Sequence, residues 1–177
     1  MKFYENDVSV LIDEATLQAR IRALGEQLTR DYTGKELTVL GVLKGSVFFA
    51  ADLARAIDLP LTVEFLGVSS YQGGTETTGE VRITQDVSKP MAGKDILVVE
   101  DIIDTGLTMK FLIENLMARH PASVKVCTLL EKPSRAKTKV PIDYKGFTIE
   151  DVFVVGFGLD YAERYRNLPF IGVMKGK

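Results

Sequence analysis

The sequence predicts an α/β fold, with a mostly parallel twisted sheet flanked by helices. Two observations carry this prediction. Strand-like apolar runs alternate with helical segments along the chain, and the runs are apolar throughout instead of every second residue, as in strands buried on both faces. At 177 residues the chain can bury one substantial core, and it shows no internal repeat, low-complexity tract or linker. Residues 1–177 are therefore expected to form a single domain.

The first half begins with an amphipathic helix and continues as strand, helix and strand. Leu17, Ile21, Leu24 and Leu28 recur at i, i+4, i+7 and i+11, which predicts a helix over 13–31. Further elements are expected as a strand at 37–43, a helix at 46–57, and a strand at 61–68 that begins after Pro60.

A polar stretch follows at 69–85. It contains Gly73, Gly74 and Gly79 and no helical stripe, so its middle is expected to be a long mobile loop. A short strand at 81–84 should close it.

The second half repeats the alternation. A strand at 95–102 leads into a helix at 107–119, and strands are expected at 124–131, 151–156 and 170–174. A polar link through Pro133 and Pro141 follows the first of these three strands.

Composition excludes several classes of function. With 22 basic and 24 acidic residues, the chain gives no electrostatic reason to expect a nucleic acid or a membrane as partner. It has no apolar run near bilayer length and no segment resembling a signal peptide. The single cysteine, Cys127, forbids an internal disulfide and fits the cytosol, and a lone His120 excludes a multi-histidine zinc site.

Residues 96–108 are the most informative segment. Four apolar residues lead into Glu100 and Asp101, and a third acid, Asp104, precedes a turn of small residues at 105–108 before a helix. Such a turn presents backbone N–H groups to a phosphate. Acids beside a phosphate site can serve hydroxyl groups, a metal or a proton, and a phosphorylated sugar held by Mg²⁺ needs all three.

Blander interpretations remain open on these residues alone. The turn could be an ordinary helix cap, Glu100 and Asp101 could be solvated acids, and Asp104 could cap the turn. Lys44, after the strand at 37–43, could be a surface lysine at a helix start. A nucleoside triphosphatase site is excluded, because no G-x-x-x-x-G-K-[ST] segment occurs.

The segment VVEDIIDTGLT at 98–108 resembles the phosphoribosyl-pyrophosphate (PRPP) signature of the type I phosphoribosyltransferases. Four further segments, in family order, narrow the resemblance to the bacterial hypoxanthine-guanine phosphoribosyltransferases. They are GVLKGS at 41–46, SSYQGGT at 69–75, LLEKPSR at 129–135 and FVVGFGLDYAERYRNLPFIGV at 153–173. The resemblance implies the type I phosphoribosyltransferase fold, with a small hood from the chain ends and a flexible lid loop at Ser70 and Tyr71.

The resemblance also implies how PRPP is bound. Glu100 and Asp101 would take the ribose hydroxyls, with Mg²⁺ reached through those hydroxyls and the pyrophosphate. A loop often preceded by a non-proline cis peptide, here Leu43–Lys44, would bind pyrophosphate together with Arg166. The 5′-phosphate would be wrapped through backbone amides of Asp104, Thr105, Gly106, Leu107 and Thr108, and the pyrophosphate loop comprises Leu43, Lys44 and Gly45. Other family members can carry a lysine or polar residue in place of Leu107.

The purine site is implied in the same way. Lys132 would donate to O6 of hypoxanthine or guanine, Phe153 would stack on the purine, and Val154 would meet its edge through the backbone. Backbone carbonyls near Asp160 would accept from a guanine amino group, and the Asp160 carboxylate would serve a second Mg²⁺. Asp104 would be the general acid/base near N7.

The implied activity is cytoplasmic purine salvage, in which hypoxanthine or guanine plus PRPP gives IMP or GMP plus pyrophosphate. Mg²⁺ is the implied cofactor, and a homodimer or homotetramer the implied assembly. Three alternatives stay open: a xanthine-preferring transferase, a nucleotide-sensing RNA-binding regulator on the same fold, and a non-enzymatic receiver-like domain. An assay of nucleotide formation from each free base, beside an RNA-binding test, separates them.

Overall fold

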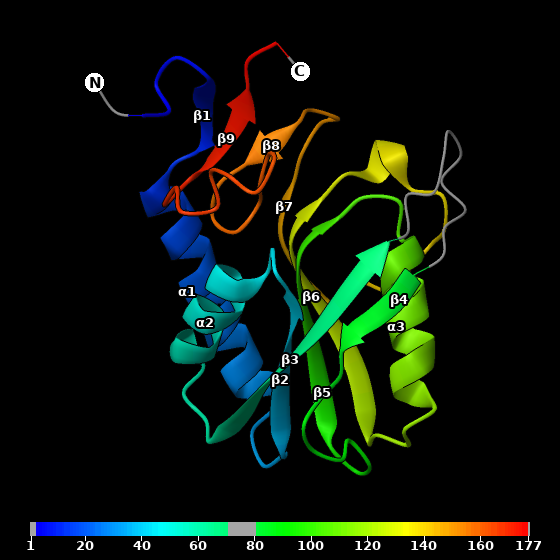
Figure 1. The fold of residues 1–177 in the computed structure, drawn as a ribbon. Helices are drawn as coiled ribbons and strands as arrows, with labels where there is room; N and C mark the ends of the chain where they lie inside the picture. The colour runs from blue at the N-terminus through cyan, green and yellow to red at the C-terminus, as the bar shows by residue number, and fades with distance from the viewer. Residues whose placement is uncertain (1–2, 71–80, 177) are drawn as a thin grey trace.

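A six-stranded sheet forms the centre of the molecule in the computed structural model, which describes residues 3–70 and 81–176 (Figure 1). Its strand order is β4-β3-β2-β5-β6-β7, and every pair is parallel except β3 with β4. The strands are β2 (Leu37–Leu43), β3 (Leu61–Ser70), β4 (Val81–Gln85), β5 (Asp95–Ile103), β6 (Ser123–Glu131) and β7 (Tyr144–Thr148).

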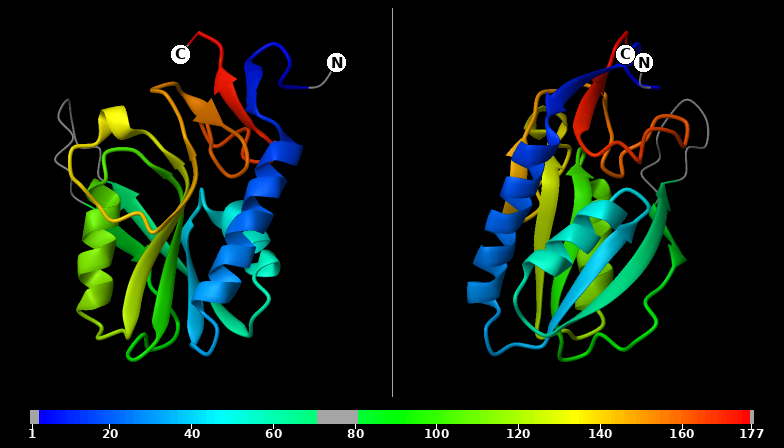
Figure 2. Two further views of the ribbon diagram at one scale, coloured as in Figure 1. Left: turned by 180° about the vertical axis from the view of Figure 1, so that it is seen from behind. Right: turned by 90° about the vertical axis from the view of Figure 1, so that its left-hand side faces the viewer.

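Helices cover both faces of this sheet, as Figures 1 and 2 show. Helices α1 (Glu14–Asp31) and α2 (Val47–Ala56) share one core with the sheet, and α3 (Leu107–Met117) contributes to a second core on the other face. The Asp13 carboxylate accepts a hydrogen bond from the backbone N–H of Thr16 at 2.8 Å and so caps the start of α1. The predicted apolar stripe of this helix is fully buried.

Strand β5 explains why the central strands are apolar throughout. Leu97 and Val99 pack in the core with α1 and α2, whereas Ile96 and Val98 pack in the core with α3. Successive side chains of a strand point to opposite faces, and both faces are covered here. The predicted α/β fold with a mostly parallel sheet is confirmed.

A second, three-stranded sheet forms a hood over one end of the main sheet (Figures 1 and 2). It has the order β1-β9-β8, all antiparallel, and brings together segments from both ends of the sequence. Its strands are β1 (Val8–Ile12), β8 (Val154–Val155) and β9 (Ile171–Met174).

Several predicted boundaries were wrong. The strand expected at 151–156 pairs only at Val154–Val155, and the link expected to be irregular contains β7 and a short 3-10 helix, η1 (Pro133–Arg135). Strand β3 extends through Ser70, beyond its expected end at residue 68, because its last residues pair with β4. Helix α3 ends at Met117 instead of residue 119.

The lid prediction is only partly covered by the described residues. Ser70 ends β3 and is paired with Val81, while Tyr71 lies outside the described residues. Across the described ranges, the helices are all too short or too polar to span a bilayer.

Candidate functional site

Three loops meet where β2, β5 and β6 end, beneath the hood. They are the loop at 44–46 before α2, the turn at 104–106 before α3, and the segment from Lys132 into η1. Ligands of parallel α/β sheets bind beyond the carboxyl ends of the strands. The sheet therefore gathers the predicted residues from distant parts of the chain.

Strand β5 divides its two acids between two of these loops. Glu100 lines a pocket of about 90 Å³ with Thr105, Gly106 and Thr108. Asp101, on the opposite face, lies so close to Gly45 that a Cβ on this glycine would overlap Oδ2 of the aspartate. Because adjacent strand residues point to opposite faces, one carboxylate meets the α3 turn and the other meets the α2 loop.

Both acids are only 9% exposed, and burial raises the pKa of each carboxyl above its usual range. For Glu100 the neighbouring charge of Asp101 raises the pKa further. Two carboxyls with these raised pKa values favour a ligand that brings hydroxyl donors or a cation.

The turn before α3 has the geometry of an anion site. Gly106 adopts φ 80°, and its carbonyl begins the helix by accepting from Lys110 N at 2.9 Å. The backbone N–H groups of Lys137 and Thr138 donate to the Thr105 carbonyl at 3.0 and 3.2 Å and brace the turn from outside. The N–H of Leu107 donates to Thr105 Oγ1 at 3.4 Å. The first-turn N–H groups of a helix have no intrahelical acceptor, so a phosphate can bind at this turn.

The loop before α2 is held from two sides. Its Leu43–Lys44 peptide is cis, as the family resemblance implied. Gly45 packs against Asp101, and a Cβ on Gly158 would overlap the Gly45 carbonyl oxygen. Only glycine fits such an approach of two backbones, so this loop, β5 and the hood loop hold one another in place.

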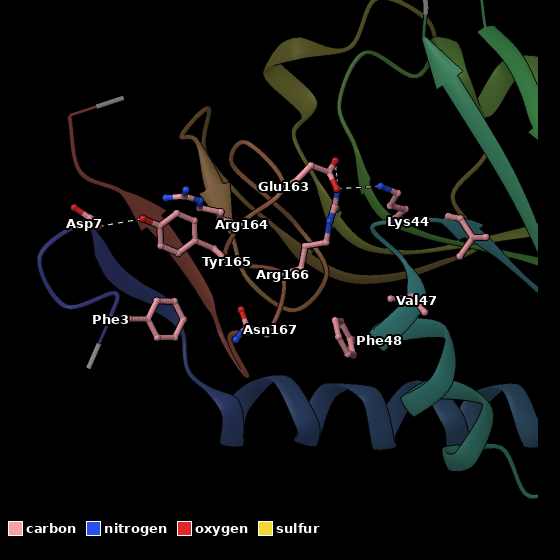
Figure 3. Close-up of a pocket in the computed structure, with 11 residues that line it drawn as sticks. Phe3, Asp7, Lys44, Val47, Phe48, Glu163, Arg164, Tyr165, Arg166 and Asn167 are labelled. Atoms are coloured by element: carbon pink, nitrogen blue, oxygen red, sulfur yellow. Dashed lines mark hydrogen bonds and ion pairs between the residues drawn. The ribbon is translucent and has the colours of Figure 1, made fainter. Parts of the chain in front are cut away.

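Two cations lie where the family resemblance implies that pyrophosphate binds. Lys44 Nζ is 3.0 Å from Glu163 Oε2, and Arg166 Nη2 is 3.1 Å from Glu163 Oε1 (Figure 3). Arg166 Nη2 is also 2.9 Å from Asp160 Oδ1. Arg166 also donates to the Gly158 carbonyl at 2.7 Å. Hydrogen bonds from Lys44 and then Arg166 lower the pKa of Glu163.

The predicted purine residues lie on the hood side. Lys132 is 8% exposed, its N–H donates to the Ile103 carbonyl at 3.0 Å, and its Nζ is 3.7 Å from Asp151 Oδ1. Phe153 is 40% exposed and meets Tyr161 edge to face, with ring centroids 5.7 Å apart. Val154 is buried in β8. The half-exposed Phe153 ring can accept a flat ligand, and the Lys132 side chain is buried instead of solvated.

Asp104 is held by a residue to which the sequence assigned no role. Nε of Arg135, in η1, lies 2.7 Å from Asp104 Oδ1, and Nη1 of Arg135 lies 3.6 Å from Asp151 Oδ1. These two carboxylates raise the pKa of Arg135. Arg135 thus links the phosphate turn to the hood.

A pocket of about 970 Å³ contains only part of the predicted site (Figure 3). It includes Leu43, Lys44 and Arg166 on one side and Phe3 and Tyr165 on the other. The turn before α3 opens into its own smaller pocket. The loop before α2 and the turn before α3 therefore line separate pockets.

The carboxylates do not form a protein-only metal cage. Among the residues that the structure describes, no three His, Cys, Asp or Glu side chains are grouped closely enough to hold a metal ion. Mg²⁺ usually keeps waters and substrate oxygens in its shell and uses one or two carboxylates. The buried pair Glu100 and Asp101, together with Asp160, fits this sparse use of protein ligands.

The sequence did not point to Arg135, Gly158 and Glu163. For Gly158, the only signal in the sequence is that a glycine occurs in the segment F-G-L-D. Glu163 lies three residues from Arg166, as does Asp160 from Glu163, and this spacing of charges could have suggested a local network.

Comparisons with known proteins agree with this geometry. A family model described as a phosphoribosyl transferase domain matches residues 11–162. A hypoxanthine-guanine phosphoribosyltransferase of Staphylococcus aureus is 49% identical over 171 residues, covering 96% of each chain. The crystal structure of a hypoxanthine phosphoribosyltransferase from S. aureus superposes with a TM-score of 0.94 at 48% identity, covering 98% of this chain and 95% of the other.

A more distant match is a Trypanosoma cruzi hypoxanthine phosphoribosyl transferase studied for the role of its C-terminal region in oligomeric state and activity. It has a TM-score of 0.92 at 36% identity and covers 99% of this chain and 95% of the other.

Proposed function

The chain belongs to the phosphoribosyl transferase family, and from this premise we propose how its residues transfer a phosphoribosyl group to hypoxanthine or guanine. The chain is a purine-salvage enzyme that converts the base and PRPP into IMP or GMP and pyrophosphate. The observation that carries the residue assignment is the division of the β5 acids between two anion-binding loops.

The phosphoribosyl half is assigned to β5 and the turn that follows it. The 5′-phosphate binds the backbone N–H groups of 105–108, supported by the hydroxyls of Thr105 and Thr108. Glu100 and Asp101 accept hydrogen bonds from the ribose hydroxyls, which satisfy two carboxylates that are buried together.

Pyrophosphate is assigned to the loop of Leu43, Lys44 and Gly45 and to Arg166. The guanidinium of Arg166 can make bidentate contact with phosphate oxygens, and Lys44 adds a point charge. Mg²⁺ would be held by the substrate's hydroxyl and pyrophosphate oxygens near Glu100 and Asp101, and a second ion near Asp160. When bound, the metal offsets the charge that develops on the leaving pyrophosphate.

The purine is assigned to Lys132, Phe153 and Val154. Lys132 is buried and reaches the site as β6 ends, so its ammonium can donate to O6 of a 6-oxopurine. Phe153 stacks on the ring, and backbone groups at Val154 and near Asp160 bind its edge. Adenine carries an amino group in place of O6, and a site with a buried donor discriminates strongly against it.

The reaction joins these halves at C1′ of the ribose. The C1′–O bond to pyrophosphate breaks, the purine N9 forms the new bond, and positive charge develops at C1′. Asp104, between the β5 acids and the phosphate turn, takes the proton that leaves N7. Arg135 keeps the Asp104 carboxylate paired before substrate arrives.

The same assignment bears on the compartment, the domain organisation and the assembly of the enzyme. We place the enzyme in the cytoplasm, since its one thiol, Cys127, is buried and unpaired. We also assign one catalytic domain to residues 1–177 and a homodimer or homotetramer as its assembly.

One assay tests the proposal. Purified protein with PRPP and Mg²⁺ is given hypoxanthine, guanine, xanthine or adenine, and nucleotide and pyrophosphate are measured. Hypoxanthine and guanine should give IMP and GMP, while adenine should be inert. Preferred turnover of xanthine, or RNA binding without turnover, would contradict the proposal.

A further inference from the structure

Glu163 occupies the position between the two cations assigned to pyrophosphate. One carboxylate oxygen is 3.0 Å from Lys44 Nζ and the other is 3.1 Å from Arg166 Nη2. Figure 3 shows the carboxylate directed at both groups, at the edge of the large pocket. Each carboxylate oxygen thus contacts one cation. Two oxygens of a pyrophosphate could contact the same two cations in this way.

The backbone holds Glu163 there at a cost. Tyr161 and Arg164 exchange both backbone hydrogen bonds, at 3.1 and 3.0 Å, around a two-residue turn of Ala162 and Glu163. These central residues have φ values of 50° and 63°. Such turns favour Asn and Gly, because a Cβ is disfavoured at positive φ.

The turn is tied to the same cations. The backbone N–H of Glu163 donates to Asp160 Oδ2 at 2.8 Å, and Asp160 Oδ1 contacts Arg166. Asp160 therefore fixes the turn. The Glu163 side chain connects the hood loop with the loop before α2, because it contacts both Arg166 and Lys44. Strained residues at a ligand site point to a role in function.

We propose that Glu163 is an internal counter-ion of the pyrophosphate site, which substrate pyrophosphate displaces from Lys44 and Arg166 and which returns when product pyrophosphate leaves. This rests on the proposed function, because it takes pyrophosphate to be the ligand of those cations.

Charge and exposure support the exchange. The side chains of Lys44 and Glu163 are 68% and 67% exposed, so their ion pair is weak and screened by solvent. Pyrophosphate carries more negative charge than one carboxylate and brings several acceptor oxygens, so it replaces both contacts. The carboxylate competes with pyrophosphate and so lowers the affinity for both PRPP and product.

The test compares wild-type protein with Glu163→Gln, which keeps the shape and removes the charge. Calorimetric titration with pyrophosphate and Mg²⁺ should give about two- to tenfold tighter binding for the variant, the effect of losing the exposed pair with Lys44 and the partly buried pair with Arg166. KM for PRPP should fall by a similar factor, and kcat should not rise, because product is held longer. Glu163→Ala should show the same direction.

Glu36→Gln is the matched control. Glu36 is also an exposed carboxylate paired with a lysine, Lys94, at the opposite ends of the main strands, and its variant should bind pyrophosphate as wild type does. Melting curves verify the fold of all variants. Binding by both Glu163 variants that is weaker, or within twofold of wild type, would overturn the inference, because Glu163 would then orient the cations or do nothing.

The two proposals fail differently. A wild-type protein that binds neither pyrophosphate nor PRPP contradicts the proposed function and the inference together. A wild-type protein that binds both, with variants that bind no more tightly, contradicts the inference alone.

Discussion

Asp104 is the side chain that we propose as the general acid/base, and its only charged contact among the ion pairs described is with Arg135. Asp104→Asn should lower kcat by roughly 10²–10⁴-fold, the usual effect of losing a positioned acid/base. PRPP affinity should stay nearly unchanged, because backbone amides bind the phosphate. Steady-state and pre-steady-state kinetics measure both quantities, and near wild-type turnover would remove Asp104 from the mechanism.

Glu100 illustrates a conflict between stability and function at one residue. Because burial and Asp101 raise its pKa, the folded state binds its proton more tightly than the unfolded state does. This acid therefore costs no stability below the unfolded pKa of about 4.3, and it costs progressively more as pH rises through the folded pKa.

Glu100→Gln should consequently raise the Tm of the ligand-free protein at neutral pH by about 2–4 °C, the effect of roughly 1 kcal/mol in a chain of this size. The two proteins should converge near pH 4, and the variant should bind PRPP poorly. Thermal melts across pH provide the measurement. A variant that melts below wild type at pH 7 would show that the charged carboxylate is satisfied within the protein.

At the scale of elements, the loop before α2 contacts the hood loop at the site that we propose for pyrophosphate. Gly158→Ala should weaken PRPP binding more than tenfold, because a Cβ there overlaps the Gly45 carbonyl and pushes the loop of Lys44 away. The KM for PRPP and a pyrophosphate titration report the change.

Gly93→Ala separates this clash from backbone strain. Gly93 also has a positive φ, 71°, but a Cβ there meets nothing within 4 Å. Its variant should lose about 1 kcal/mol of stability and keep its KM for PRPP. Equal kinetic effects in the two variants would mean that strain, and not the loop contact, is responsible.

The sequence predicts elements best where local pattern and burial agree. β2 and β5 are buried on both faces, so their apolar runs mark them, and Glu100 and Asp101 stand out at the end of such a run. Strand β7 was missed because it is an edge strand with Lys145 and Gly146 in its middle, residues that are uncommon in strands. Its pairing with β6 stabilises the strand, and this pairing cannot be read from its composition.

The hood was harder to predict for a different reason. β1 has only five residues and pairs with β9, which lies near the other end of the sequence. This pairing is a long-range contact that the local sequence does not indicate. Arg135 and Glu163 could not be assigned, because a charge on a loop reveals its partner only once the chain is folded. Asp104 and Lys44 could be assigned through the family resemblance, and their positions at strand ends agree with it.

At the scale of the whole molecule, the assigned ligands connect the main sheet with the hood. PRPP contacts assigned to β5 and purine contacts assigned to β8 lie in different sheets. Nucleotide at 100 times its Kd should stabilise the protein by about 2.7 kcal/mol, or about 5–10 °C in Tm. Hydrogen exchange should slow in both sheets, and slowing confined to the main sheet would contradict the placement of the purine.

The pairing of β1 with β9 also governs when the enzyme becomes competent during its synthesis. β8 reaches the rest of the hood only through β9, which is made after every strand of the main sheet. A nascent chain can therefore assemble the six-stranded sheet and its phosphate turn first, as domains form during translation. The part of the purine site that we assign to the hood is completed only by the last strand. We therefore expect recognition of the base to be acquired after recognition of the sugar phosphate.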